Sequence, residues 1–146
     1  MKILVLGDSG MLGHMVVKYL QHNDIDVSVT NNRWPENKND ISNFNGDYII
    51  NCIGAIPQRT NNFDINWQIP IWLDLHSNCK VIHPGTDCEM DDNAYGVSKN
   101  IAGNYIRNIS NQTKSIKTSI IGPELRSNVS LLEWFLSQEG EVSGYT

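Results

Sequence analysis

Two short motifs in this chain contain residues whose types and spacing suit binding or catalysis. The segment Gly7–Gly13 has the sequence GDSGMLG, and Tyr95–Lys99, in the second half, has the sequence YGVSK. Glycines beside a helix start can hold a phosphate group through the backbone. A phenol and an ammonium four residues apart can exchange a proton with a substrate oxygen. The pair therefore suggests nucleotide binding followed by proton transfer.

The glycine motif follows an apolar run, Lys2–Leu6, and precedes an amphipathic stretch, Met11–Leu20. This order predicts a buried strand, a tight turn and the N-terminus of a helix, whose free N–H groups and dipole attract phosphate. The spacing is G-x-x-G-x-x-G, and a turn that needs glycine but binds nothing is the alternative. Predicted contacts to a dinucleotide are Gly7, Ser9, Gly10, Met11, Leu12 and Gly13.

Tyr95 and Lys99 lie in a stretch with helical periodicity, so both side chains should share one helix face. An ammonium beside a phenol favours the phenolate and should lower the pKa of Tyr95 from its reference value of about 10. The alternative is a surface tyrosine that packs on the stem of a lysine.

In this order the two motifs resemble those of the extended short-chain dehydrogenase/reductase family, and three further segments extend the likeness. Val81–Cys88 (VIHPGTDC), Thr118–Leu125 (TSIIGPEL) and Ser130–Leu136 (SLLEWFL) are similar to segments of its sugar-nucleotide reductase branch, in particular the dTDP-4-dehydrorhamnose reductase group. The resemblance covers nearly the whole chain. It implies hydride transfer from a reduced nicotinamide to a nucleotide-linked 4-keto-6-deoxy sugar.

The resemblance also assigns roles to individual residues. Tyr95 would give the proton, Lys99 would lower its pKa and hold the cofactor ribose, and Thr86 would orient the substrate carbonyl. The Asp40-Ile41 pair would lie beside adenine; the alternative is a turn residue before a short helix. Ile121 would lie near the nicotinamide; the alternative is a segment that only ends a strand. Four residues at the end of a strand would lie along the cofactor's ribose and phosphates: Cys52, Ile53, Gly54 and Ala55. The alternative is a turn at the strand end that requires Gly54 and contacts no ligand.

The choice between the two nicotinamide dinucleotides is made after the second strand. An acid there selects NAD, whereas a nearby arginine accommodates the 2′-phosphate of NADP. This chain has Thr30-Asn31-Asn32-Arg33. We therefore predict NADP(H) in preference to NAD(H), with a solvated loop cation as the alternative role of Arg33.

Strands and helices are expected to alternate along the chain, which predicts an α/β fold: a Rossmann-like, doubly wound parallel sheet with helices on both faces. The ligand should lie at the carboxyl ends of the strands, where the strand order reverses. Residues 31–44 are polar and irregular, with no full strand expected. Predicted strands are Lys2–Leu6, Asp26–Thr30, Tyr48–Cys52, Lys80–His83 and Ser115–Ile120; predicted helices are Met11–His22, Ile65–Ser77, Asn93–Ile109 and Ser130–Ser137.

Composition limits the classes of partner. The chain has 146 residues and a formal net charge of −5, which argues against nucleic acid or an anionic membrane as the main partner. It shows no apolar run of membrane-spanning length and no signal segment, so we expect a cytoplasmic protein. Three separated cysteines and four scattered histidines suggest neither a disulfide framework nor a metal site.

We expect two parts: residues 1–128 as a dinucleotide-binding domain, and residues 129–146 as a remnant or the start of a substrate-binding part. The segment Asp87–Ala94 has eight residues and is shorter than in the family, and little chain follows residue 136. Three hypotheses therefore stand. The chain is a minimal or truncated reductase, completed by a homodimer or a second polypeptide; a dinucleotide-binding module without turnover; or an interaction module with an apolar patch at Trp134–Leu136.

Overall fold

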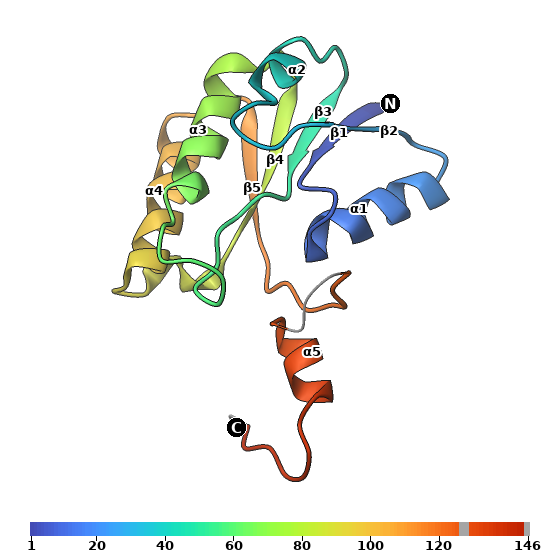
Figure 1. Ribbon diagram of the computed structural model, residues 1–146. Coiled ribbons are helices and arrows are strands. Elements are labelled where there is room, and N and C mark those ends of the chain that lie inside the picture. Colours follow the sequence, from blue (N-terminus) through green and yellow to red (C-terminus); the bar gives the residue numbers. More distant parts are fainter. Residues whose placement is uncertain (126–128, 145–146) are drawn as a thin grey trace.

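The computed structural model describes residues 1–125 and 129–144. Strands and helices alternate along these residues, and Figure 1 shows the layered arrangement that results. In chain order the elements are β1 (Lys2–Leu6), α1 (Met11–His22), β2 (Asp26–Val29), α2 (Lys38–Ser42), β3 (Tyr48–Asn51), α3 (Ile65–His76), β4 (Lys80–Gly85), the 3-10 helix η1 (Asp87–Met90), α4 (Ala94–Asn108), β5 (Thr113–Lys117) and α5 (Leu131–Leu136).

The five strands form one parallel sheet in the order β2-β1-β3-β4-β5. The chain moves outward from β1 to β2, then returns past β1 to β3 and continues in the opposite direction. The order therefore reverses between β1 and β3, where the carboxyl ends of parallel strands leave a crevice for a ligand. The predicted α/β, Rossmann-like sheet is confirmed.

Alternate residues of β1 enter two separate cores, one on each face of the sheet. Leu4 and Leu6 pack in a cluster with α2 and α3, whereas Ile3 and Val5 pack in a cluster with α1. A parallel strand covered on both faces is apolar at nearly every position, as this one is. The two clusters fix the sheet between helices and so hold the carboxyl ends of β1 and β3 in place.

Helices cover the sheet unevenly. Helices α3 and α4 lie together on one face, and α1 lies on the other, across the β1–β2 half (Figure 1). Thr113 and Lys117 of β5 contact Asp74 of α3 and Glu89 of η1, so they face the α3–α4 side. Lys114 and Ile116 alternate with them and are exposed, Ile116 by 55%. The other face of β5 is therefore open to solvent.

The structure differs from the prediction in three elements. Residues 38–42 form helix α2 within the stretch expected to be irregular, because Ile41 is fully buried in the α3-side cluster. The fifth strand ends at Lys117 rather than at Ile120, because its partner β4 ends at Gly85, opposite Lys117. Helix η1 was not predicted. The remaining elements agree with the prediction, with ends that differ by at most two residues.

One carboxylate, Asp74 on α3, joins three elements on the helical face. It accepts hydrogen bonds from Tyr105 of α4 at 2.9 Å, from Thr113 of β5 at 2.7 Å, and from Ser110 between them. Burial opposes ionisation, but these bonds outweigh it and hold the pKa of Asp74 below its usual value. The contacts fix the C-terminal end of α4 against α3 and the sheet.

Asp74→Asn is expected to lower the free energy of unfolding at pH 7 by about 1–3 kcal/mol, because hydrogen bonds to a charged acceptor are replaced by weaker ones. Since its folded pKa is depressed, Asp74 stabilises the protein above the unfolded pKa of the carboxyl and less as pH falls below it. Urea denaturation at pH 7 and at pH 3.5 measures both effects. Glu36→Gln, at an exposed position, is the control; equal stabilities of the two variants at pH 7 would contradict the prediction.

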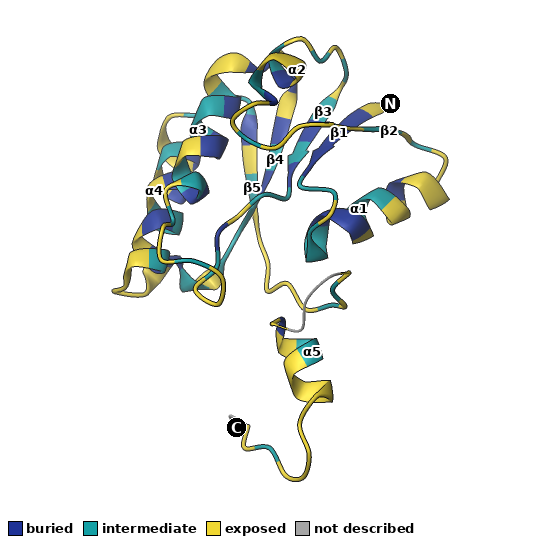
Figure 2. Ribbon diagram, in the orientation of Figure 1, coloured by how far each residue is buried: buried dark blue, intermediate teal, exposed yellow. Residues whose placement is uncertain are grey.

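Helix α5 lies apart from the sheet, beyond its carboxyl edge, and none of its residues is buried (Figures 1 and 2). Trp134, Phe135 and Leu136 are exposed by 42%, 56% and 68%. The predicted boundary between residues 128 and 129 adjoins residues 126–128, which lie outside the described chain. The division into two parts stays a prediction.

Candidate active site

A cleft of about 900 Å³ opens at the carboxyl edge of the sheet. Its walls come from the turn after β1, the loops after β3 and β4, the start of α4, and the segment after β5. Nine of the residues predicted for the site line it: Gly10, Met11, Leu12, Cys52, Ile53, Gly54, Thr86, Tyr95 and Lys99. The cleft therefore brings both sequence motifs to one place, although they are far apart in the chain.

The glycine turn packs the end of β1 closely against the start of α1. Gly7 has φ +77°, a conformation that favours glycine, and its carbonyl accepts from Gly10 N–H at 3.0 Å. A Cβ at Gly13 would collide with the Gly7 carbonyl, so α1 can pack this closely only with glycine there. Helix α1 begins after Gly10 without a side-chain cap, which leaves its first N–H groups for a ligand. Ser9 is exposed beside the turn and does not line the cleft.

Tyr95 lies in the first turn of α4, where the Asn93 side chain caps the helix by accepting from Gly96 N–H at 2.8 Å. Its ring packs edge-on against Phe63, with centroids 5.7 Å apart. Lys99 lies one turn further along, with Nζ 5.9 Å from the Tyr95 ring centroid. A Cβ on Gly54 would lie 3.5 Å from this ammonium, so Lys99 reaches across to the end of β3. The predicted shared face of Tyr95 and Lys99 is confirmed.

The predicted effect of Lys99 on the pKa of Tyr95 is wrong. Burial raises the pKa of Tyr95 above its usual value, and the negative charges of Cys88 and Asp87 add to this, against a lowering hydrogen bond from Thr86. Burial also lowers the pKa of Lys99. Desolvation therefore outweighs the attraction between ammonium and phenolate. Tyr95 stays protonated at neutral pH, as a proton donor must.

Thr86 follows β4 and caps helix η1, where its hydroxyl accepts from Cys88 N–H at 3.2 Å. The Thr86 hydroxyl donates to Asp87 Oδ1 at 3.2 Å and lines the same cleft as Tyr95, whose pKa it helps to lower. Its predicted role toward a substrate carbonyl stays a prediction. Cys52, also in the cleft, is an inert thiol at neutral pH because burial raises its pKa to about 12.

Polar residues beneath the cleft, not predicted from sequence, support the lysine. Asn66 of α3 bonds the backbone of Ala55 in both directions, at 2.8 and 3.0 Å, and donates to the Ser98 hydroxyl at 3.1 Å. Ala55 is buried, so its predicted part in the site is limited to this backbone connection. The network ties the end of β3 to the residue that precedes Lys99. The sequence did offer a signal for this network, namely polar residues such as Asn66 and Ser98 within helices whose other positions follow an apolar pattern.

Besides Gly7, Ser9, Gly13 and Ala55, four more predicted cofactor contacts lie outside the residues that line the cleft. Arg33 and Asp40 are exposed, in the loop after β2 and in α2. Ile41 is 0% exposed, so its side chain serves the core and offers no surface to adenine. Ile121 is 65% exposed, beyond the end of β5. The predicted contact of Ile41 is therefore wrong, whereas those of Arg33, Asp40 and Ile121 stay predictions.

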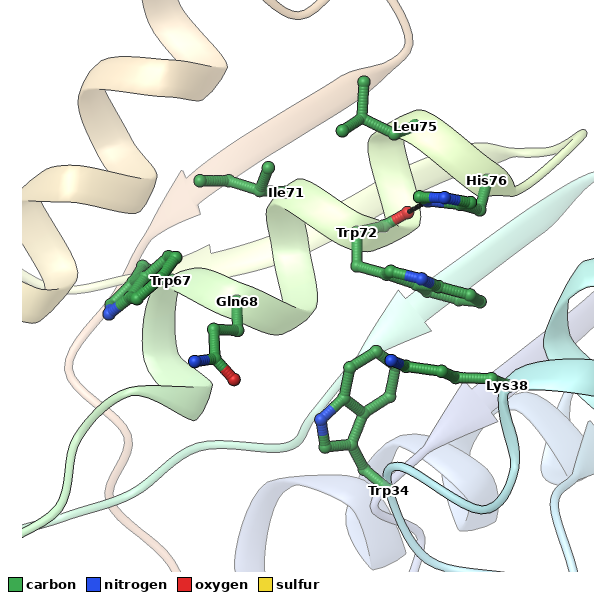
Figure 3. A pocket seen from close by; sticks show the side chains of 8 residues that line it. All are labelled: Trp34, Lys38, Trp67, Gln68, Ile71, Trp72, Leu75 and His76. Carbon is green, nitrogen blue, oxygen red and sulfur yellow. Dashed lines mark hydrogen bonds between the residues drawn. The ribbon is translucent and has the colours of Figure 1, made fainter.

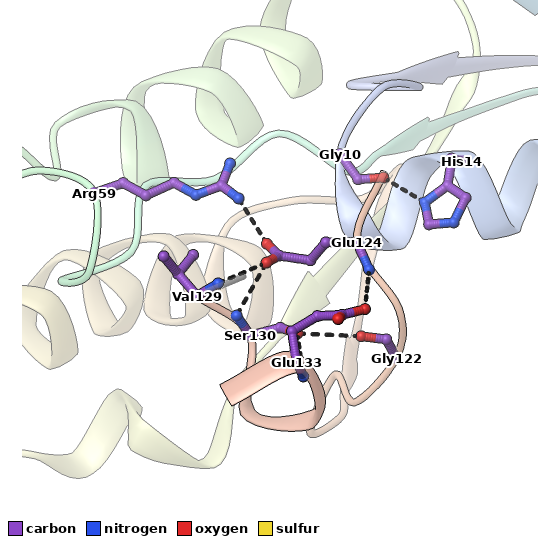
Figure 4. Close-up of polar contacts among 8 residues, drawn as sticks. All are labelled: Gly10, His14, Arg59, Gly122, Glu124, Val129, Ser130 and Glu133. Atoms are coloured by element: carbon purple, nitrogen blue, oxygen red, sulfur yellow. Dashed lines mark hydrogen bonds and ion pairs between the residues drawn. The ribbon is translucent and has the colours of Figure 1, made fainter. Parts of the chain in front are cut away.

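Polar contacts fasten the segment after β5 across the mouth of the cleft (Figure 4). Glu124, with a side chain only 5% exposed, pairs with Arg59 at 2.6 Å, and Arg59 comes from the loop after β3. The same carboxylate accepts from Val129 N–H at 2.8 Å and Ser130 N–H at 3.1 Å. The loop after β3 and the segment after β5, two strands that β4 separates in the sheet, are thus joined at the cleft.

A smaller hollow of about 260 Å³ lies on the outer side of α3 (Figure 3). Trp34 meets Trp72 edge-on, with centroids 5.1 Å apart, and Trp72 stacks on His76 at 4.7 Å. Lys38 Nζ lies 4.7 Å from the Trp34 ring centroid. None of the residues predicted for the site lines this hollow.

In the part of the chain that the structure describes, no group of three or more histidine, cysteine, aspartate or glutamate side chains could hold a metal ion. No helix in these residues combines the length and the apolar character needed to span a membrane.

No protein-family model and no curated protein matches this chain, but solved structures share its fold. The UDP-rhamnose synthase of Acanthamoeba polyphaga mimivirus is 20% identical, with a TM-score of 0.65 over 80% of this chain and 56% of that one. A dTDP-4-dehydrorhamnose reductase of Clostridium acetobutylicum is 20% identical, with a TM-score of 0.64 over 86% of this chain and 56% of that one. The capsular polysaccharide assembling protein CapF of Staphylococcus aureus is 15% identical, with a TM-score of 0.67 over 99% of this chain and 44% of that one.

At these identities the likeness shows the α/β Rossmann-like fold. Other solved structures with this fold were determined with bound NAD or in complex with NADP. The chain spans about half the length of the structures that it matches.

Proposed function

We propose that this chain is an NADP(H)-dependent reductase of the extended short-chain dehydrogenase/reductase family, acting on a nucleotide-linked 4-keto-6-deoxy sugar. One observation carries the proposal: Tyr95, Lys99 and Thr86 line the same cleft as the glycine turn. A dinucleotide held by that turn would share the cleft with the proton donor Tyr95. The sequence motifs and the rhamnose-related neighbours support the same assignment.

The cofactor would be held chiefly by backbone groups. The N–H groups at the start of α1 would take the pyrophosphate, and the small residues at the end of β3, Gly54 among them, leave room for the ribose beside Lys99. Arg33, exposed after β2, would meet the 2′-phosphate of NADP. Neighbours that bind either dinucleotide support a nicotinamide cofactor, and Arg33 is the reason for preferring NADP(H).

The chemistry of the chain's own residues is proton transfer and orientation. The cofactor, when bound, supplies the hydride for reduction of a carbonyl carbon. The Tyr95 hydroxyl donates its proton to the carbonyl oxygen, and Thr86 holds that oxygen by a second hydrogen bond. Because the pKa of Tyr95 is raised, the hydroxyl carries its proton at neutral pH, which suits reduction rather than the reverse oxidation.

Residues 129–146 would belong to the substrate-binding part, with residues 1–128 as the dinucleotide-binding domain. The matched structures are about twice as long, so further groups that hold the sugar nucleotide would come from a second copy, another polypeptide or additional chain. We place the protein in the cytoplasm, where nucleotide sugars and NADPH are available. The alternative function is a dinucleotide-binding or interaction module without turnover, favoured by the exposed apolar side chains of α5.

A thermal-shift titration tests cofactor binding. NADPH at 100 times its dissociation constant should stabilise the protein by about 2.7 kcal/mol, which raises Tm by several degrees, and NADH should do so less at equal concentration. Gly13→Ala should lose the shift because its Cβ would displace the Gly7 carbonyl. Gly122→Ala, where the added methyl meets nothing, is the matched control.

A shift with NADPH and its consumption with a 4-keto sugar nucleotide would support the reductase. A shift without consumption would favour the binding module. No shift with either dinucleotide would reject both and leave an interaction role.

A further inference from the structure

The turn between Thr86 and Tyr95 contains a buried acid, Glu89, that lies outside the cleft lining. It is on the four-residue helix η1 and is 3% exposed. An ionised carboxylate at such a depth needs charged or hydrogen-bonding partners. Its partners show what the acid holds together.

Two cations from different elements meet the same carboxylate oxygen. Arg107 of α4 donates from Nη1 to Glu89 Oε1 at 2.8 Å, and Lys117 Nζ, at the end of β5, pairs with that atom too. Arg107 is itself held by Asn104 Oδ1 at 2.8 Å. Burial opposes ionisation of Glu89, but these partners hold its pKa below its usual value. One charge therefore connects the turn with α4 and with β5.

Two glycines on α4 let the turn lie directly on the helix. A Cβ on Gly103 would lie 2.7 Å from Glu89 Oε2, and one on Gly96 would lie 2.7 Å from the Cys88 carbonyl oxygen and closer still to that of Asp91. The glycines are seven residues apart, two helical turns, and so share one face. The turn thus rests on the helix that carries Tyr95, and the Glu89 carboxylate fastens it there.

We propose that Glu89 is a positioning residue, which holds the turn 86–91 on α4 and thereby fixes Thr86, Asp87 and Cys88 around the Tyr95 hydroxyl. The proposal rests on the proposed function for the role of that hydroxyl. Glu89 itself touches neither substrate nor cofactor. Its effect passes through the turn, because Thr86, Asp87 and Cys88 line the same cleft as Tyr95 and, with the burial of the phenol, bear on its ionisation.

Glu89→Gln removes the charge that both cations hold while preserving side-chain size. With the turn loosened, Tyr95 is better solvated and further from Asp87 and Cys88, so we expect its pKa to fall toward the reference value of about 10. Tyrosinate absorbance measures this, as the difference between Glu89→Gln and the same variant carrying Tyr95→Phe. If reduction occurs, kcat should fall about tenfold, or about 1.4 kcal/mol, with NADPH affinity unchanged.

Asp74→Asn is the matched control, because it replaces a carboxylate that also accepts several hydrogen bonds but lies on α3, away from the cleft. It should lower stability without moving the ionisation of Tyr95. Lys117→Met, which removes one exposed cation, should give a smaller shift in the same direction and replaces Glu89→Gln if that variant does not fold.

Unchanged Tyr95 ionisation in Glu89→Gln or, where needed, Lys117→Met would overturn the role of Glu89, as would an equal shift in Asp74→Asn. The absorbance readout needs no turnover. A shifted Tyr95 in a protein without reductase activity would therefore support the positioning role and reject the proposed reaction.

Discussion

Tyr95→Phe is expected to lower the rate of NADPH-dependent reduction by a factor of about 10² to 10⁴, the usual contribution of a positioned proton donor. The substitution removes one hydroxyl and keeps the ring, so the packing against Phe63 remains. NADPH affinity should not change, because the glycine turn and Lys99 are unaltered. Steady-state kinetics with a 4-keto sugar nucleotide, together with the thermal-shift titration, separates the two effects.

Tyr105→Phe is the matched control for this substitution. It lies on the same helix but donates its hydroxyl to Asp74 on the side of α3, away from the cleft. It should cost stability and leave turnover of the folded protein intact. Undiminished turnover in Tyr95→Phe would remove the tyrosine from the mechanism. The unaltered enzyme should hold a constant kcat through neutral pH and lose activity only when Tyr95 ionises, above the ordinary tyrosine pKa of about 10.

Acidification should destabilise the protein through His83, a buried residue of β4. Asn51 Oδ1 accepts from Ile53 N–H, which directs Nδ2 of that amide to His83 Nδ1 at 3.2 Å. The ring nitrogen must accept here, and it cannot do so once protonated. Burial, together with the positive charge of Lys99, lowers the pKa of His83 to about 3. Between about pH 3 and pH 6.5, the folded protein therefore keeps this ring neutral, whereas the unfolded chain protonates it.

The sign and size of this effect follow from proton binding. The unfolded chain takes up the proton below pH 6.5 and the folded protein does not until about pH 3. The stabilisation is therefore complete above pH 6.5 and is lost as pH falls toward 3. The loss is about 1.4 kcal/mol per unit, or roughly 3 kcal/mol by pH 4.5. Urea denaturation across this range measures it.

His83→Gln keeps a side chain that can accept from Asn51 and removes the titration. Its stability should fall less steeply between pH 6 and pH 4.5 than that of the unaltered protein, by about one proton in the slope. His76→Gln, on the exposed end of α3, should retain the steep dependence. Parallel curves for the unaltered protein and His83→Gln would show that His83 titrates normally when folded.

The sheet could be predicted because its signals are local and repeated. β1 is apolar at nearly every position and is followed by the glycine motif and an amphipathic helix, a pattern typical of a strand buried on both faces. Helix α2 escaped prediction because five residues with one buried side chain, Ile41, show no periodicity. Its helical form depends on the core beneath it. The end of β5 likewise depends on where its partner β4 stops.

The site could be predicted as a set of residues but not as an electrostatic environment. Spacing placed Tyr95 and Lys99 on one face, and strand order brought them to the glycine turn. The raised pKa of Tyr95 comes from burial and from charges that lie close only in the folded turn. Glu89 gave no signal in sequence, because its partners Arg107 and Lys117 are distant in the chain. For both Tyr95 and Glu89, the sequence does not reveal which distant residues bury the side chain in the folded protein.

The open face of β5 affects how the stability of this protein varies with temperature. Apolar surface that is in water before unfolding adds nothing to the change in heat capacity, and the exposed side chains of Ile116 and of α5 are surface of this kind. Such a chain has a flatter stability curve than a fully enclosed domain of equal length. Its denaturant m-value is also smaller, since less new surface meets the solvent when it unfolds.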